Sequence, residues 1–171
     1  MTNVSIIGGG AWGTALAMAA KRAGSDVCIQ ARELEVVESI YTSHENTMYL
    51  PGHALDPTIR AVTDPIEAIN GADVLLLVTP AQHSRALMTT LNEALSPEQS
   101  IVICSKGIEQ GTSALLSEIV YEVNPDLSPM ILSGPTFAAE VASQRPTAVT
   151  LATTDQTKGD LVSKAIGTPY F

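Results

Sequence analysis

The chain is short of positive charge and has no long apolar run. The chain has nine Lys and Arg residues and eighteen Asp and Glu residues, which gives a formal net charge of −9. Nucleic acid and anionic membrane surfaces are therefore not expected partners. No run approaches the roughly 18 apolar residues that cross a bilayer, and no integral membrane contact is expected. The first residues show no basic region ahead of a long apolar core, so we also expect no signal peptide.

The two cysteines and three histidines form no metal-binding or disulfide pattern. Cys28 and Cys104 each lie inside an apolar run, and their spacing fits neither a zinc site nor a disulfide framework. We expect two buried thiols of a cytoplasmic protein, with a cross-link between them as the less favoured alternative. His44, His53 and His83 are expected at the surface or as caps, and no metal is predicted.

Apolar residues are what the chain has in quantity. They make up 45% of the 171 residues, whereas charged residues make up only 16%. This composition argues against disorder and is enough for one domain with a sizeable core. We find no internal repeat and no low-complexity linker, so residues 1–171 are predicted to form a single domain.

Strand and helix patterns alternate along the chain. Apolar runs predict strands at residues 4–7, 27–30, 59–62, 73–79, 100–104, 130–132 and 148–151. Helical spacing and capping residues predict helices at residues 11–23, 34–43, 82–94, 112–123, 136–142 and 154–166, and a short one that Asp64 caps. Thr112 is the expected cap of its helix, and Tyr170-Phe171 are expected to enter one more strand. The alternation predicts an α/β fold, a Rossmann-type doubly wound, mostly parallel sheet with helices on both faces.

The first strand runs straight into Gly8-Gly9-Gly10-Ala11-Trp12-Gly13, a G-x-G-x-x-G sequence. Its place between a strand and a helix makes it a dinucleotide-binding fingerprint. Gly8 permits a tight turn, Gly10 lets the backbone approach a diphosphate, and Gly13 lets the helix pack close to the strand. Free N–H groups at the helix start would then face the anion, with Trp12 packed near the turn. A glycine-rich turn without a ligand is the alternative.

Loops that follow parallel strands meet at one edge of the sheet, where the ligand of this fold binds. Such loops are residues 8–13, Arg32, residues 79–81, residues 105–107 and residues 133–136. We expect Pro80, which ends its strand, to line the cofactor site. Arg32 can pair with a 2′-phosphate where NAD-selective sites carry an acid, so NADP is favoured and NAD tolerated. A solvated surface charge is the alternative for Arg32.

Two further loops carry candidate chemistry. Lys106 follows the strand at residues 100–104, where its hydrogen bonds can orient a carbonyl or hydroxyl group, and we predict a catalytic role for it. An ordinary surface lysine is the alternative. In Ser133-Gly134-Pro135-Thr136, Gly134 allows close approach and Thr136 can cap the next helix, as in an anion-binding turn. A plain turn fits that segment equally well.

Five segments in this order resemble one enzyme family: Gly8 to Ala17, Asn46 with Tyr49-Leu50-Pro51-Gly52, Ser105-Lys106-Gly107-Ile108-Glu109, Leu132 to Glu140, and Pro146-Thr147-Ala148. Together they are similar to the bacterial-type NAD(P)-dependent glycerol-3-phosphate dehydrogenases, essentially from end to end of the chain. The resemblance implies reversible hydride transfer between NAD(P)H and dihydroxyacetone phosphate, which gives sn-glycerol 3-phosphate for phospholipid synthesis.

The resemblance also implies roles for single residues. Ala11, Trp12, Arg32 and Ala138 match cofactor-contacting positions. Lys106 matches a residue that cofactor and substrate share, and Gly134 and Thr136 match substrate contacts.

Family members continue into a helical second half that supplies a second lysine and a phosphate-binding arginine segment. The chain ends at Phe171, so we expect it to bind cofactor with little activity alone. We also expect an exposed apolar patch where the helical half would dock, with self-association that allows a homodimer. Two alternatives stay open: another two-domain reductase of hydroxy or keto acids, and a non-catalytic NADP-binding module.

Overall fold

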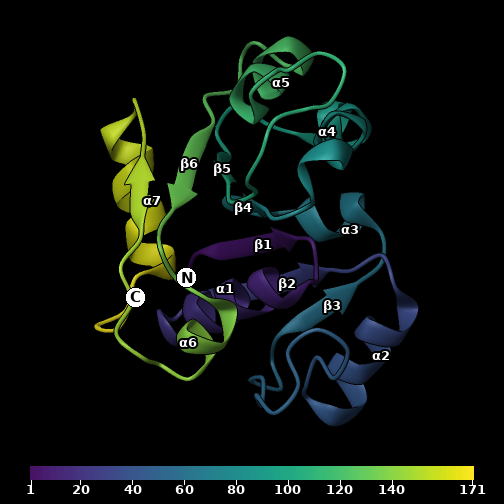
Figure 1. The fold of residues 1–171 in the computed structure, drawn as a ribbon, viewed down its shortest axis with the longest axis vertical. Coiled ribbons are helices and arrows are strands. Elements are labelled where there is room, and N and C mark those ends of the chain that lie inside the picture. The colour runs from purple at the N-terminus through teal and green to yellow at the C-terminus, as the bar shows by residue number, and fades with distance from the viewer.

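Strands and helices alternate throughout the computed structural model, which describes all 171 residues (Figure 1). The strands are β1 (Asn3–Ile7), β2 (Asp26–Gln30), β3 (Arg60–Val62), β4 (Val74–Leu77), β5 (Ser100–Ile103), β6 (Met130–Ser133) and β7 (Thr150–Ala152). The helices are α1 (Ala11–Arg22), α2 (Leu34–Ser43), α3 (Pro65–Ile69), α4 (Ser84–Leu91), α5 (Leu116–Val123), α6 (Ala138–Ala142) and α7 (Gln156–Ile166). Single 3₁₀ turns, Ala81–His83 and Asn92–Ala94, flank α4. The predicted elements up to residue 166 are present, with ends displaced by a few residues.

All seven strands form one sheet in the order β3-β2-β1-β4-β5-β6-β7. The first six strands of that order run parallel. The direction of winding reverses between β1 and β4, so the loops after these two strands diverge from a common point at the carboxyl edge. Sheets of this kind bind ligands at that switch point. The predicted Rossmann-type, mostly parallel α/β fold is confirmed.

The edge strand β7 runs antiparallel to β6, unlike the other pairs. A parallel connection must carry the chain back along the whole length of the sheet. Helix α6 has five residues and spans only about 7 Å at 1.5 Å per residue. The next strand therefore starts at the edge where β6 ends and runs in the opposite direction.

Two apolar layers, one on each face of the sheet, contain the buried core. In β4, Val74 and Leu76 pack with α1, α2, α6 and α7, whereas Leu75 and Leu77 pack with α3, α4 and α5. Both faces of the central strands are thus covered, which is why their sequences are continuous apolar runs. No helix is long and apolar enough to cross a membrane.

The two cysteines are free thiols on opposite faces of the sheet. Cys28 lies in the layer of α3 and Cys104 in the layer of α1, and both are buried. Burial raises the pKa of each thiol above its ordinary value, which makes both poor nucleophiles. The prediction of buried thiols is confirmed, and the cross-link is excluded by the intervening sheet.

The expected start of α5 at Thr112 is wrong. Gly111 and Ser113 have positive φ angles of 87° and 60° and hold a turn at this point. The Thr112 hydroxyl donates to the Glu109 carboxylate (2.6 Å) within that turn. The helix therefore begins only at Leu116.

The expected cap of α6 at Thr136 is also wrong, because the helix begins two residues later, at Ala138. The Phe137 N–H donates to the Glu140 carboxylate (3.1 Å), so an acidic side chain of the first turn replaces the hydroxyl cap. The Thr136 hydroxyl is left for another partner.

Tyr170 and Phe171 do not enter a strand. The Thr168 N–H donates to the Phe171 carbonyl (2.8 Å), and the Thr147 N–H donates to the Tyr170 carbonyl (2.9 Å). Pro169 has no N–H group to donate to a strand ladder. The segment therefore closes into a turn beside residue 147.

Candidate functional site

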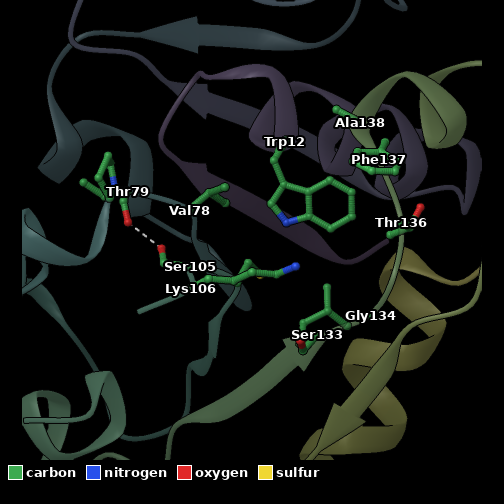
Figure 2. A pocket seen from close by; sticks show the side chains of 13 residues that line it. Trp12, Val78, Thr79, Ser105, Lys106, Ser133, Gly134, Thr136, Phe137 and Ala138 are labelled. Carbon is green, nitrogen blue, oxygen red and sulfur yellow. Dashed lines mark hydrogen bonds between the residues drawn. The ribbon is translucent and has the colours of Figure 1, made fainter. Parts of the chain in front are cut away.

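Loops that follow β1, β4, β5 and β6 enclose a cavity of about 340 Å³ at the carboxyl edge of the sheet (Figure 2). Its lining consists of Trp12, Val78, Thr79, Pro80, Cys104, Ser105, Lys106, Leu132, Ser133, Gly134, Thr136, Phe137 and Ala138. Six residues predicted from the sequence are thus brought together: Trp12, Pro80, Lys106, Gly134, Thr136 and Ala138. They come from four different loops, because parallel strands end at the same edge.

The glycine turn lets α1 begin directly on the end of β1. Gly8 has a φ of +123°, and a Cβ atom there would lie 3.0 Å from the Val78 carbonyl carbon. A Cβ atom on Gly13 would be driven into the Gly8 carbonyl oxygen. On Gly10, by contrast, it would meet nothing within 4 Å. Gly8 and Gly13 therefore close the turn on its protein side, while Gly10 leaves an open approach to the backbone.

A row of backbone donors lies at this turn. The N–H groups of residues 9–13, which include Ala11, have no hydrogen-bond partner in the chain. On either side of the row, the Gly8 N–H donates to Gln30 (3.1 Å) and the Thr14 N–H donates to Gly10 (2.9 Å). The row begins a 12-residue helix whose macrodipole adds partial positive charge at this end. Unpaired N–H groups next to the open space at Gly10 are suited to bind a diphosphate group.

Lys106 is the only charged side chain that lines the cavity. It extends from the loop after β5 toward Trp12 and Gly134 (Figure 2), and it takes no part in the five ion pairs of the chain. No carboxylate lines the cavity, although the chain is acidic as a whole. A ligand carbonyl or anion would therefore meet one cation and backbone donors.

The loop that carries Lys106 is fixed on both sides. The Ser105 hydroxyl donates toward the carbonyls of Leu77 (3.2 Å) and Thr79 (Figure 2). Beyond Lys106, the Glu109 carboxylate accepts hydrogen bonds from Arg85 Nε (2.9 and 3.0 Å) and Nη2 (2.9 Å). The Arg85 guanidinium holds the pKa of Glu109 below its usual value. Sequence reasoning missed this pair, since no local spacing links α4 to the loop.

Gly134 and Thr136 project from the loop after β6. A Cβ atom on Gly134 would lie 2.6 Å from the Ala148 carbonyl oxygen, so this backbone packs closely on the segment before β7. The Thr136 hydroxyl is buried and has no hydrogen-bond partner. Thr136 lines the cavity as a residue, whereas its hydroxyl oxygen itself has almost no exposed surface.

Helix α6, which follows this loop, is tied to α1 by one side chain. Arg22 donates to the carbonyls of Val141 (2.9 Å) and Ala142 (2.7 Å) at the end of α6. The guanidinium thus gives the Ala142 carbonyl a partner and adds a second donor to the Val141 carbonyl, which also accepts from the Gln144 N–H (3.1 Å). The arrangement keeps Ala138, at the start of α6, beside the glycine turn.

Arg32 does not line the cavity. It follows β2, its side chain is 84% exposed, and its guanidinium lies 3.1 Å from the Glu33 carboxylate. The preceding residue, Ala31, is packed against the turn, because a Cβ atom on Gly9 would lie 2.6 Å from the Ala31 Cβ. Arg32 therefore borders the glycine turn on the β2 side, away from Lys106.

A buried asparagine reaches the glycine turn from a distant segment. Asn46 lies between α2 and β3, is 0% exposed, and donates to the Gly9 carbonyl (2.8 Å). Sequence reasoning gave this residue no role of its own, because neither periodicity nor spacing connects residue 46 to residue 9.

Trp12, which lines the cavity, makes an edge-to-face contact with Phe171, with ring centroids 6.4 Å apart. The chain holds no cluster of three His, Cys, Asp or Glu residues that could bind a metal ion.

Strand order, glycine turn and switch-point cavity define the chain as a dinucleotide-binding α/β domain. Residues 3–159 match the family model of the NAD-dependent glycerol-3-phosphate dehydrogenase N-terminus. The chain belongs to this family of N-terminal, NAD-binding domains.

Curated relatives and solved structures agree with that assignment. The chain is 48% identical to a glycerol-3-phosphate dehydrogenase [NAD(P)+] of Parvibaculum lavamentivorans over 98% of its own length and 50% of the relative's. It is 47% identical to that of Rhodospirillum rubrum over 99% of its length and 48% of the relative's. The crystal structure of glycerol-3-phosphate dehydrogenase from Coxiella burnetii superposes with a TM-score of 0.93 at 28% identity, covering 99% of this chain and 52% of that one. The chain thus spans about half the length of these relatives.

Two glycine substitutions separate the structural from the open positions of the turn. Gly13→Ala is expected to destabilise the fold by about 3 kcal/mol, since its Cβ would overlap the Gly8 carbonyl. Gly10→Ala is the matched control and is expected to cost less than about 1 kcal/mol, because its Cβ enters open space. Chemical denaturation measures both, and a Gly13→Ala protein as stable as wild type would contradict the packing described.

The ion pair at the Lys106 loop gives a pH-dependent stability. Because the folded-state pKa of Glu109 is lowered, its contribution is complete above the ordinary glutamate pKa of about 4.3 and is lost as pH falls further. Glu109→Gln is therefore expected to lower the melting temperature at pH 7, with the difference from wild type shrinking below about pH 4. Glu93→Gln, at an exposed carboxylate in no ion pair, is the control. A pH-independent Glu109→Gln difference would contradict the assignment.

Proposed function

We propose that the chain is the cofactor-binding half of an NAD(P)-dependent glycerol-3-phosphate dehydrogenase. Such an enzyme transfers a hydride reversibly between NAD(P)H and dihydroxyacetone phosphate to give sn-glycerol 3-phosphate. One observation carries the proposal: the unpaired N–H groups of residues 9–13 adjoin a cavity whose only charged group is Lys106. This combination suits a dinucleotide whose diphosphate meets the N–H groups, with the carbonyl group of a separate substrate beside Lys106.

The cofactor would lie along the carboxyl edge of the sheet. Gly8, Gly10 and Gly13 shape the turn, and the N–H groups of Ala11 and Trp12 belong to the row that would receive the diphosphate. Pro80, Lys106 and Ala138 line the adjoining cavity, where the nicotinamide ring would bind. Most of the exposed surface of this lining is apolar, which suits a flat heteroaromatic ring.

Lys106, Gly134 and Thr136 would hold the substrate. A bound reduced nicotinamide supplies the hydride for the substrate carbonyl carbon. The Lys106 ammonium can donate a hydrogen bond to the carbonyl oxygen, where negative charge develops during the transfer. Gly134 and Thr136 line the same cavity as Lys106 and would position the rest of the substrate.

We also propose that NADP is preferred over NAD, and Arg32 supports this. Its exposed guanidinium borders the glycine turn on the side where the adenosine ribose binds in this fold. A 2′-phosphate would compete with Glu33 for the guanidinium and offers a doubly charged, bidentate partner.

We also predict a cytoplasmic location and a homodimer. The 75% exposed Phe137, at the cavity mouth, is the apolar residue that a docking partner would cover.

Cofactor titrations test the binding role. Trp12 is the single tryptophan and lines the cavity, so quenching of its fluorescence by NADPH and NADH reports binding directly. Arg32→Ala is expected to raise the dissociation constant of NADPH about tenfold or more and that of NADH less than about threefold. Arg60→Ala, which removes an exposed arginine paired with Glu67, should change neither. Equal losses for both nucleotides in Arg32→Ala would remove the 2′-phosphate role.

The 171 residues alone are expected to bind cofactor without efficient turnover. Lys106 is the single cation of the cavity, and it would have to orient the carbonyl, deliver a proton and offset the substrate phosphate together. General acid–base catalysis contributes about 10²–10⁴-fold, so we expect a kcat below about 0.1 s⁻¹ against the usual ~10 s⁻¹. Oxidation of NADPH by dihydroxyacetone phosphate, followed at 340 nm, measures it. Turnover at an ordinary enzyme rate would contradict the expectation.

A further inference from the structure

Asn46 is the one side chain outside α1 that forms a hydrogen bond with the glycine turn. Its Nδ2 donates to the Gly9 carbonyl and to Thr14 Oγ1, both at 2.8 Å. Its Oδ1 accepts from the Tyr49 N–H at 3.1 Å. The orientation of the amide is fixed by chemistry, since the Gly9 oxygen can only accept and the Tyr49 N–H can only donate. A fully buried side chain thus uses one N–H bond on the turn and the other on Thr14, the residue that follows it.

Thr14 extends this contact to the next peptide. Its hydroxyl donates to the Gly10 carbonyl at 2.9 Å, so its single proton is used there and it must accept from Asn46. Thr14 is itself 0% exposed. A continuous relay from Asn46 therefore reaches two successive carbonyls of the turn: that of Gly9 directly, and that of Gly10, which the Thr14 N–H also bonds.

Holding a carbonyl also fixes the N–H on the other side of the same peptide. Every peptide bond of the chain is trans, so C=O and N–H point in opposite directions across each peptide plane. With the Gly9 carbonyl turned inward to Asn46, the Gly10 N–H must point outward. The Gly10 carbonyl is turned into α1 in the same way, which directs the Ala11 N–H outward. Both belong to the row of unpaired donors at the open approach to Gly10.

Glycine makes this restraint necessary. The Gly9–Gly10 peptide is flanked by residues without Cβ atoms, so rotation of its plane meets little steric resistance. A rotated plane would present the Gly9 carbonyl oxygen, with its partial negative charge, to the ligand. Nothing else in the chain bonds the Gly9 carbonyl.

We propose that Asn46 is a positioning residue that orients the Gly10 and Ala11 N–H groups toward the cofactor diphosphate, through direct contact with Gly9 and through Thr14. The proposal rests on the proposed cofactor-binding function and adds a residue that lies behind the turn. Asn46 acts on the ligand only through the backbone, so its removal changes diphosphate affinity and leaves the choice between NADP and NAD unchanged.

The test measures NADH and NADPH affinity by Trp12 fluorescence in Asn46→Ala and in a matched control. Asn46→Ala is expected to raise both dissociation constants at least about tenfold, by equal factors, since N–H bonds to a charged group are lost. Asn124→Ala is the control. Asn124 donates to Asn92 (2.8 Å) and accepts from the Asp126 N–H (3.1 Å) at the end of α5, and its loss should leave both affinities unchanged.

If Asn46→Ala does not fold, two variants of Thr14 test the proposal instead. Thr14→Val removes the hydroxyl at constant shape and is expected to weaken both nucleotides, whereas Thr14→Ser keeps the hydroxyl and restores wild-type affinity. If the role of Thr14 were purely structural, its substitution would lower the melting temperature of the apo protein, and Thr14→Val and Thr14→Ser would not differ in nucleotide affinity. A folded Asn46→Ala or Thr14→Val protein that binds NADH as wild type does would overturn the proposal alone. Wild-type protein that binds neither nucleotide would overturn the proposed function as well.

Discussion

The contact between Gly13 and the carbonyl of Gly8 is the constraint on which the site depends. It leaves no room for a side chain, and so lets α1 start where β1 ends rather than after a wider loop. This close start places the first N–H groups of α1 at the switch point between β1 and β4. The other site loops reach the same place because their strands run parallel to these two.

Charge in this protein is arranged so that the backbone, rather than the surface, would attract an anion. The chain carries a net charge of −9, which by itself repels a phosphorylated ligand. Two local features offset this repulsion at the cavity: no carboxylate lines it, and helix N–H groups and Lys106 adjoin it. Two acidic side chains near the site form ion pairs with arginines: Glu109 with Arg85, and Glu33 with Arg32. The site thus keeps its positive character through a few short-range groups.

The fold and the cavity residues were predictable because local signals and one topological rule determine them. Apolar runs predicted the strands, and parallel strands bring Trp12, Lys106 and Thr136 to one edge. The wrong predictions concern where elements begin and end: Thr112 is held by Glu109 in a turn and does not cap its helix, and Tyr170-Phe171 close into a turn instead of a strand. Asn46 was missed for a different reason: it contacts Gly9, which is distant in sequence, and its irregular segment carries no pattern that points there. Such interactions are set by the completed fold, so sequence spacing alone does not reveal them.

Amide chemical shifts test the central claim most directly, because the claim is that main-chain N–H groups bind the diphosphate. A ¹H–¹⁵N spectrum of the 171-residue protein would be recorded during addition of NADH or NADPH. The account predicts the largest shifts at the amides of residues 9–13, and none at Gly8, whose N–H is already bonded to Gln30. Saturating shifts that leave residues 9–13 unmoved, or no shifts at millimolar nucleotide, would contradict it.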